Sequence, residues 1–273
     1  MFLYWLIFLA AVFLVLSQRQ GIDVRIYSQW RLGFDGVLLT LFCVIGLRYQ
    51  IGGDWSAYDL HNQSALGKPF TSVLSGLSGN HDEIGYAFFN WIGANIAGGV
   101  FIPNLVCAAI LTAGLRKFCL TLTNSALGVV VAIPYLMLVV GQGYTRQAAA
   151  IGCFLYALSY VREQRILAYV VSIFFATLFH NSALIFAFLA IFVRTKSISL
   201  ISFLLVSAGV LFLGFVFLFF LDNYIYNKYI YGYITESYLS GGGGYRLSLT
   251  AICACLCLVY SSKLCGKFED RMF

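Results

Sequence analysis

The chain alternates between apolar runs and short polar segments along almost its whole length. The apolar runs cover residues 2–16, 34–47, 98–115, 126–140, 147–161, 166–179, 183–193, 198–221 and 247–262. A helix that crosses a bilayer upright needs about 20 residues, so flanking residues must extend the shorter runs. The pattern predicts an all-α, polytopic membrane protein with about nine transmembrane helices.

The composition agrees with a membrane protein. Of the 273 residues, 61% are hydrophobic and 10% are charged, whereas soluble domains have about 45–50% apolar and about 25% charged residues. A water-soluble enzyme is therefore excluded, and we expect residues 1–273 to form a single integral membrane domain. The net charge of +6 does not indicate nucleic acid binding, because the basic residues are distributed as orientation signals.

The distribution of Lys and Arg predicts how the chain is oriented. With nine spans, the loops on one side contain Arg19, Arg25, Arg31, Arg116, Lys117, Arg162, Arg165, Arg194, Lys196, Lys263, Lys267 and Arg271. The opposite side contains Arg48, Lys68, Arg146, Lys228 and Arg246. Because basic residues concentrate in cytoplasmic loops, we expect an external N-terminus and a cytoplasmic C-terminus. No basic residue precedes the run 2–16, so we interpret this run as a retained span.

This orientation places the polar chemistry outside, in loops 48–97, 141–146 and 222–246. All three histidines, His61, His81 and His180, fall on this outer side. The eight cysteines lie in or beside apolar stretches, which favours small apolar fillers over a disulfide framework or a zinc site.

The first outer loop begins with a double glycine. Gly52 and Gly53 allow a sharp turn that aims Asp54 back toward Arg48. The simpler interpretation of this arrangement is an Arg48–Asp54 ion pair that closes the loop.

The same loop contains His81, Asp82 and Glu83, which have the side-chain types of metal ligands. The apolar-periodic run that follows favours another interpretation, in which Asp82 is the N-cap of a helix over about 83–96 and Glu83 lies in its first turn. We expect this helix to lie at the membrane interface.

The second outer loop places Arg146 at the start of a span. The helix dipole does not favour a cation there. Arg146 and the backbone N–H groups of the helix start are suited to bind a phosphate or diphosphate. Snorkelling of Arg146 to lipid headgroups is the alternative.

His180 lies between two short apolar runs, which predicts a tight hairpin with this residue at its tip. A histidine at that depth requires a partner or a task. Histidine exchanges protons near neutral pH, so His180 beside Arg146 is a candidate general base. A hydrogen-bonded structural histidine is the alternative.

The third outer loop is rich in tyrosine and ends in a run of four glycines, Gly241 to Gly244, before Tyr245 and Arg246. An aromatic belt at the membrane interface explains most of the tyrosines. Some of them are also suited to stack on sugars.

Several of these motifs, in this order, resemble the EpsG family of bacterial polysaccharide polymerases and, more loosely, Wzy O-antigen polymerases. The resemblance depends on Arg48, Gly52, Gly53, Asp54, Trp55, Tyr58, Glu83, Gly85, Tyr86, Arg146, Gln147, Ala148 and residues 179–184. It implies an enzyme of the bacterial inner membrane that joins polyprenyl-diphosphate-linked oligosaccharide repeat units at the periplasmic face. It also implies a chain-length regulator as a partner, and we expect no metal or other cofactor.

In such a reaction, a sugar hydroxyl attacks the anomeric carbon of the donor and expels polyprenyl diphosphate. The leaving group needs charge stabilisation and the hydroxyl needs a base. We expect His180, Asp54 and Arg146 to be catalytic. The expected substrate-binding residues are Arg48, Trp55, Tyr58, Glu83, Tyr86, Gln147, Tyr245 and Arg246.

Two other functions compete with this prediction. A transporter or flippase of lipid-linked glycans would carry functional polar residues at mid-membrane, and the long spans have almost none. A membrane acyltransferase would use an intramembrane histidine with a donor reached from the cytoplasm, whereas all the histidines are expected on the outer side.

Overall fold

The computed structural model describes residues 2–17, 24–71, 83–161, 163–194 and 252. All but the last belong to the first of two compact units, residues 1–198. Within the described ranges every regular element is a helix, which agrees with the all-α prediction. The spans expected at 198–221 and 247–262, and the third outer loop, lie outside the described residues, so the nine-span count and the single domain stay predictions.

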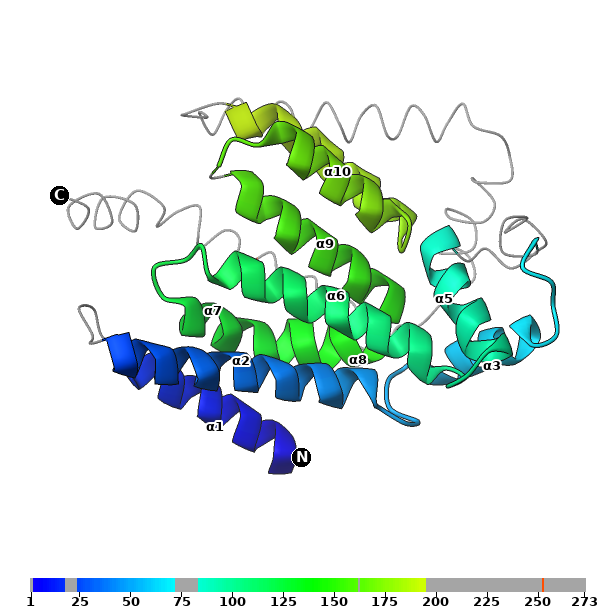
Figure 1. Ribbon diagram of the computed structural model, residues 1–273, viewed down its shortest axis with the longest axis horizontal. Coiled ribbons are helices and arrows are strands. Elements are labelled where there is room, and N and C mark those ends of the chain that lie inside the picture. The colour runs from blue at the N-terminus through cyan, green and yellow to red at the C-terminus, as the bar shows by residue number, and fades with distance from the viewer. Residues whose placement is uncertain (1, 18–23, 72–82, 162, 195–251, 253–273) are drawn as a thin grey trace. The chain divides into compact units, whose positions relative to one another are not determined.

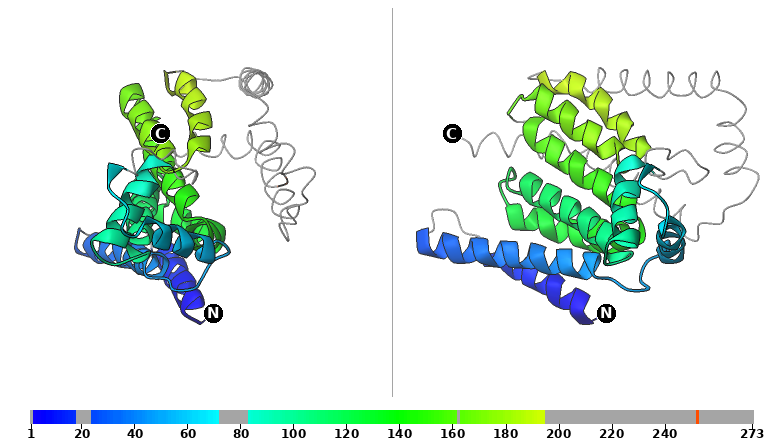
Figure 2. Two further views of the ribbon diagram at one scale, coloured as in Figure 1. Left: turned by 90° about the vertical axis from the view of Figure 1, so that its right-hand side faces the viewer. Right: turned by 45° about the vertical axis from the view of Figure 1, so that its right-hand side comes forward.

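The helices of the first unit run back and forth along one bundle (Figure 1). They are α1 (Phe2–Ser17), α2 (Val24–Gly46), α6 (Phe101–Cys119), α7 (Ser125–Ala132) with the π-helix η1 (Ile133–Val140) and α8 (Gly141–Gly143), α9 (Thr145–Val161), α10 (Ile166–Thr177) and the 3-10 helix η2 (Asn181–Arg194). Each of these segments overlaps one expected apolar run. Figure 2 shows the same arrangement from other sides.

Three described helices are long and apolar enough to cross a membrane: Tyr27–Gly46, Phe101–Cys119 and Ser125–Gly143. Large apolar side chains also cover the outer faces of the shorter helices. Phe2, Leu16 and Leu167 are each at least 75% exposed. Soluble monomers avoid such continuous apolar surfaces, so this chain is a membrane protein.

Two short helices lie beyond one end of the bundle, where α2 ends and α6 begins (Figure 1). They are α3 (Trp55–Ala65) and α5 (Ile84–Asn95). The sequence predicted the second of them to within one residue at each end. It did not predict α3, because this segment is largely polar and contains no apolar run.

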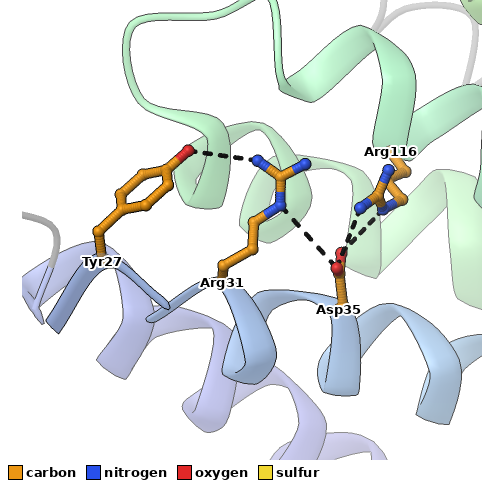
Figure 3. Close-up of polar contacts among 4 residues, drawn as sticks. All are labelled: Tyr27, Arg31, Asp35 and Arg116. Atoms are coloured by element: carbon orange, nitrogen blue, oxygen red, sulfur yellow. Dashed lines mark hydrogen bonds and ion pairs between the residues drawn. The ribbon is translucent and has the colours of Figure 1, made fainter. Parts of the chain in front are cut away.

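Helix α2 begins at Val24, so the expectation that Arg25 and Arg31 lie in a loop is wrong. Arg31 and Asp35 are one turn apart on α2, with 3.9 Å between Nε and Oδ2. Arg116 of α6 binds Asp35 through two parallel hydrogen bonds of 2.8 and 3.0 Å (Figure 3). The pair joins α2 to α6, and this compensation lets the helix continue through charged residues.

Helices α6 and α9 approach closely at two glycines. A Cβ on Gly114 would lie 1.9 Å from the carbonyl oxygen of Gly152, and a Cβ on Gly152 would lie 2.5 Å from the carbonyl oxygen of Ile110. Small residues permit such backbone contact between membrane helices, where dispersion forces drive association. The contact fixes where α9, and Arg146 near its start, lie relative to α6.

We predict that Gly114→Ala lowers the free energy of unfolding of the purified protein by about 1–3 kcal/mol, because the added methyl group overlaps the α9 backbone. Gly36→Ala is the matched control, since a Cβ on this glycine of α2 meets nothing within 4 Å. Unfolding temperatures in detergent measure both. Equal unfolding temperatures for the two variants would contradict the close contact.

Candidate active site

Glu83 lies at the N-terminus of α5, where it is the N-cap residue. A carboxylate is favoured at this end of a helix, because the backbone N–H groups point toward it. The expected partners in a metal site, His81 and Asp82, lie outside the described residues. Within the described ranges, no group of three or more His, Cys, Asp or Glu residues could hold a metal ion.

The carboxylate of Glu83 binds side chains from two other parts of the bundle. Its Oε2 accepts a hydrogen bond of 3.0 Å from Nη1 of Arg146, at the start of α9. Its Oε1 lies 3.1 Å from Nδ1 of His180, between α10 and η2. The backbone N–H of Asn181 also donates to Oε1. We call Glu83, Arg146 and His180 the Glu83 cluster.

The cluster is partly open to its surroundings. The side chain of Glu83 is 8% exposed, whereas those of Arg146 and His180 are 27% and 29% exposed. The carboxylate therefore lies beneath the two groups that it orients. This arrangement leaves the histidine and arginine accessible to a bound molecule.

The position of Glu83 determines which nitrogen of His180 carries the proton. An ionised carboxylate only accepts hydrogen bonds, so Nδ1 must donate to it. In the neutral ring, Nε2 then has a lone pair that can accept a proton. The carboxylate also stabilises the imidazolium that forms, as the acidic residue of a Ser-His-Asp triad does.

The environment of Glu83 keeps its carboxyl group ionised. Burial raises the pKa of this group, but the hydrogen bond with His180 and the charge of Arg146 outweigh burial, so its pKa lies below the ordinary value of 4.5. At neutral pH the cluster thus contains a carboxylate between a guanidinium and an imidazole.

Two tyrosines surround the guanidinium of Arg146. The rings of Tyr58 on α3 and Tyr86 on α5 have their centroids 6.0 and 5.8 Å from its Cζ. Both residues are buried, at 4% and 0% exposure. Burial raises the pKa of Tyr58 above the ordinary value, and Arg146 opposes this shift. The phenol of Tyr58 therefore stays protonated at neutral pH, and the rings of both tyrosines favour the cation.

Gly85 fixes the distance between α5 and the His180 turn. Its N–H donates a 2.8 Å hydrogen bond to the carbonyl oxygen of Leu178, and a Cβ at this position would lie 2.7 Å from that oxygen. A side chain would therefore push α5 away from α10. The glycine allows the close approach that places Glu83 against His180.

An apolar groove of about 420 Å³ lies directly beside the cluster. Ile84 and Gly85, which follow Glu83, form one part of its wall, and Leu178 and Phe179, which precede His180, form another. The remaining lining residues are Phe70, Phe88, Phe89, Ile110 and Phe175. A charged cluster and an aromatic-lined groove thus adjoin each other.

The other predicted site residues are more scattered. Arg48 is buried, at 3% exposure, and bonds to Gly141, Asn104 and Thr145. Within the described contacts its guanidinium forms no direct ion pair, so the loop-closing Arg48–Asp54 ion pair suggested by the sequence is wrong, although the charge of Asp54 acts on Arg48 from further away. Asp54 is the N-cap of α3 but makes no side-chain capping bond.

Trp55 and Gln147 are the remaining predicted residues that the structure describes. Trp55 is half-buried, with its ring centroid 6.0 Å from the Cζ atom of Arg48. Gln147 is exposed on α9. Tyr245 and Arg246 lie outside the described residues.

Sequence reasoning did not identify Asn104 and Thr145, which are both 1% exposed. Asn104 was the detectable one, because it is a polar residue inside an apolar run, where it needs a partner. Thr145 gave no such signal, since its position at the start of a helix is ordinary for threonine.

We predict that Glu83 stabilises the fold in a pH-dependent way. Because its pKa in the folded state is depressed, its contribution is present above the ordinary value and is lost as the pH falls through the folded value. The comparison is made in the His180→Gln background, which retains a hydrogen-bond donor but does not titrate.

In that background, adding Glu83→Gln should lower the unfolding temperature by a constant amount between pH 7 and about pH 5. The difference should narrow below the ordinary value of 4.5. Thermal unfolding in detergent across this range measures it. A difference that persists unchanged to pH 3 would contradict an ionised, paired carboxylate.

The comparison with protein families identifies the chain. The model of the EpsG family matches residues 36–273, a range that includes the Glu83 cluster, the groove and the buried Arg48. No curated protein and no solved structure matches the chain. Since the family model covers most of the sequence, the protein belongs to the EpsG family.

Proposed function

We propose that this protein is a membrane glycosyltransferase that polymerises polyprenyl-diphosphate-linked oligosaccharide repeat units into O-antigen, capsule or exopolysaccharide. Membership of the EpsG family supports a role in polysaccharide polymerisation. The observation that carries the proposal is the Glu83 cluster, which combines an oriented imidazole with a guanidinium.

In the proposed reaction, a hydroxyl oxygen of the acceptor sugar forms a bond to the anomeric carbon of the donor. The bond between this carbon and the diphosphate oxygen breaks, and its electron pair leaves with the polyprenyl diphosphate. The hydroxyl proton passes to Nε2 of His180, whose Nδ1 is held by Glu83.

Arg146 has the complementary role of stabilising the negative charge on the departing diphosphate. A planar guanidinium binds phosphate oxygens through several directed N–H groups. Arg146 also lies at the start of α9, where backbone N–H groups favour anions. Asp54, near the start of α3, is the second candidate for the base, with Trp55 and Tyr58 following it on the same helix.

The apolar groove beside the cluster supports a lipid-linked substrate. Its lining is aromatic and aliphatic, without a charged side chain. The first isoprene units of a polyprenyl chain are suited to such a surface. A substrate placed in this way has its diphosphate near Arg146 and its sugars on the side away from the bilayer.

We propose that the cluster faces the periplasm in the bacterial inner membrane. The positions of three basic residues support this proposal: Arg116 and Lys117 lie in the last turn of α6, and Arg165 lies between α9 and α10. These residues are at the opposite helix ends from Arg146 and His180.

The orientation predicts that Lys68→Cys and Arg165→Cys, each in a background without the eight natural cysteines, react differently with a membrane-impermeant maleimide. Position 68 should label in intact spheroplasts, and position 165 should label only after permeabilisation. Both positions are exposed. Labelling of both positions in intact spheroplasts would contradict the proposed topology.

Activity is tested with purified protein and a lipid-linked repeat unit from cells that lack the protein, with glycan ladders as the readout. A general base contributes about 10²–10⁴-fold, so His180→Ala and His180→Gln should both lose at least about 100-fold in rate. Arg146→Lys should also lose most activity, since a point charge does not replace the planar fork.

His61→Gln is the matched control, because His61 lies on α3 and is not part of the cluster. It should retain the ladder. If His180→Gln were active while His180→Ala was not, His180 would be structural, and Asp54→Asn would test the alternative base. Normal ladders from all variants of the cluster would overturn the proposed function.

A further inference from the structure

Arg48 has a buried charge that the proposed chemistry does not use directly. It follows the C-terminus of α2 and is 3% exposed. No carboxylate accepts a hydrogen bond from its guanidinium within the described contacts, and Asp54 acts on it only through its charge. Burying a cation that is not bonded to a carboxylate is costly unless other hydrogen bonds hold it in place, so the acceptors around Arg48 indicate what it does.

Its acceptors come from both sides of one break in the chain. Nη1 donates to the carbonyl oxygen of Gly141, at the start of α8, over 2.8 Å. Nη2 donates to Oγ1 of Thr145, the first residue of α9, over 2.5 Å. Nη2 also donates to Oδ1 of Asn104 on α6, over 3.4 Å.

The break determines the direction in which Arg146 points. Helix α8 ends at Gly143, and Tyr144 has a non-helical backbone with φ −129° and ψ 70°. Helix α9 then begins at Thr145, directly before Arg146. Arg48 thus links the residues on each side of the break, and one of them is the immediate neighbour of the arginine in the Glu83 cluster.

The loop after α2 makes a second contact with the same segment. Gly52 has φ +106°, and a Cβ on it would lie 2.0 Å from the carbonyl oxygen of Gln142. Few residues other than glycine adopt this conformation, and none with a side chain fits against that backbone. The loop that carries Arg48 is therefore held against the break at two points.

We infer that Arg48 is a positioning residue, which holds the α8–α9 break so that Arg146 reaches Glu83. Its consequence for catalysis rests on the proposed function. A lysine retains the charge but lacks the planar fork that serves separate acceptors. Two further buried donors, Nε of Arg48 and Nδ2 of Asn104, find no acceptor within the described residues. The geometry of the break therefore depends on the three hydrogen bonds that Arg48 donates.

The inference is tested by measuring the coupling between Arg146 and Glu83 without any activity assay. Unfolding temperatures of Arg146→Gln, Glu83→Gln and the double variant give the coupling as the deviation from additivity. The cycle is repeated in the Arg48→Lys and Thr145→Val backgrounds. Thr145→Val is the milder change and decides the question if Arg48→Lys does not fold.

Two backgrounds serve as controls. Thr145→Ser keeps the hydroxyl that accepts from Arg48, and Thr112→Val removes a buried hydroxyl that bonds only within α6. We expect the coupling to disappear in Arg48→Lys and Thr145→Val and to persist in both controls. Coupling that persists in Thr145→Val, or that disappears in Thr112→Val, would overturn the inference.

The outcome is distinguishable from a failure of the proposed function. If the coupling is lost as expected while Arg146→Lys still polymerises the repeat unit normally, Arg48 positions Arg146 but Arg146 does not serve the proposed reaction. If Arg146→Lys is inactive while the coupling is insensitive to Arg48, the function stands and the positioning role is wrong.

Discussion

The arrangement of the site depends on one carboxylate. Glu83 accepts hydrogen bonds from the start of α9 and from the turn between α10 and η2, so it joins three segments that are far apart in the sequence. In a low-dielectric surrounding, such charge-assisted bonds are strong and leaving one unmade is costly. The same bonds orient the imidazole and the guanidinium, which links the stability of this region to its proposed chemistry.

Glycine residues allow the helices to approach closely enough for these hydrogen bonds to form. Gly114 and Gly152 let α6 and α9 touch, and Gly85 lets α5 reach the end of α10. Bilayer lipids are as apolar as the helix surfaces, so close backbone contact rather than hydrophobic burial holds the helices together. The polar groups then meet at the ends of helices whose relative positions are already fixed.

The sequence predicted the parts of this structure that depend on local pattern. Apolar runs on both sides of a polar tripeptide indicated the His180 turn. The apolar run that follows Arg146 likewise indicated that a helix begins near this residue. The partners of Arg48 could not be predicted, because its acceptors lie 56 to 97 positions away. Asp54, near in sequence, was the natural but incorrect partner. Likewise, Glu83 was expected in the first turn of α5, and the three-way contact arises only from tertiary packing.

The apolar groove beside Glu83 determines which concentration of a lipid-linked substrate governs its binding to the site. The lipid-linked substrate that we propose, with its chain in this groove, would arrive by lateral diffusion within the bilayer and not from bulk water. Its encounter with the site is then governed by its mole fraction among the lipids. Diluting the whole vesicle suspension leaves that quantity unchanged, whereas adding inert lipid reduces it. For the lipid-linked substrate that we propose, saturation would therefore be a property of membrane composition, and Ile84 and Leu178 of the groove would contact its chain.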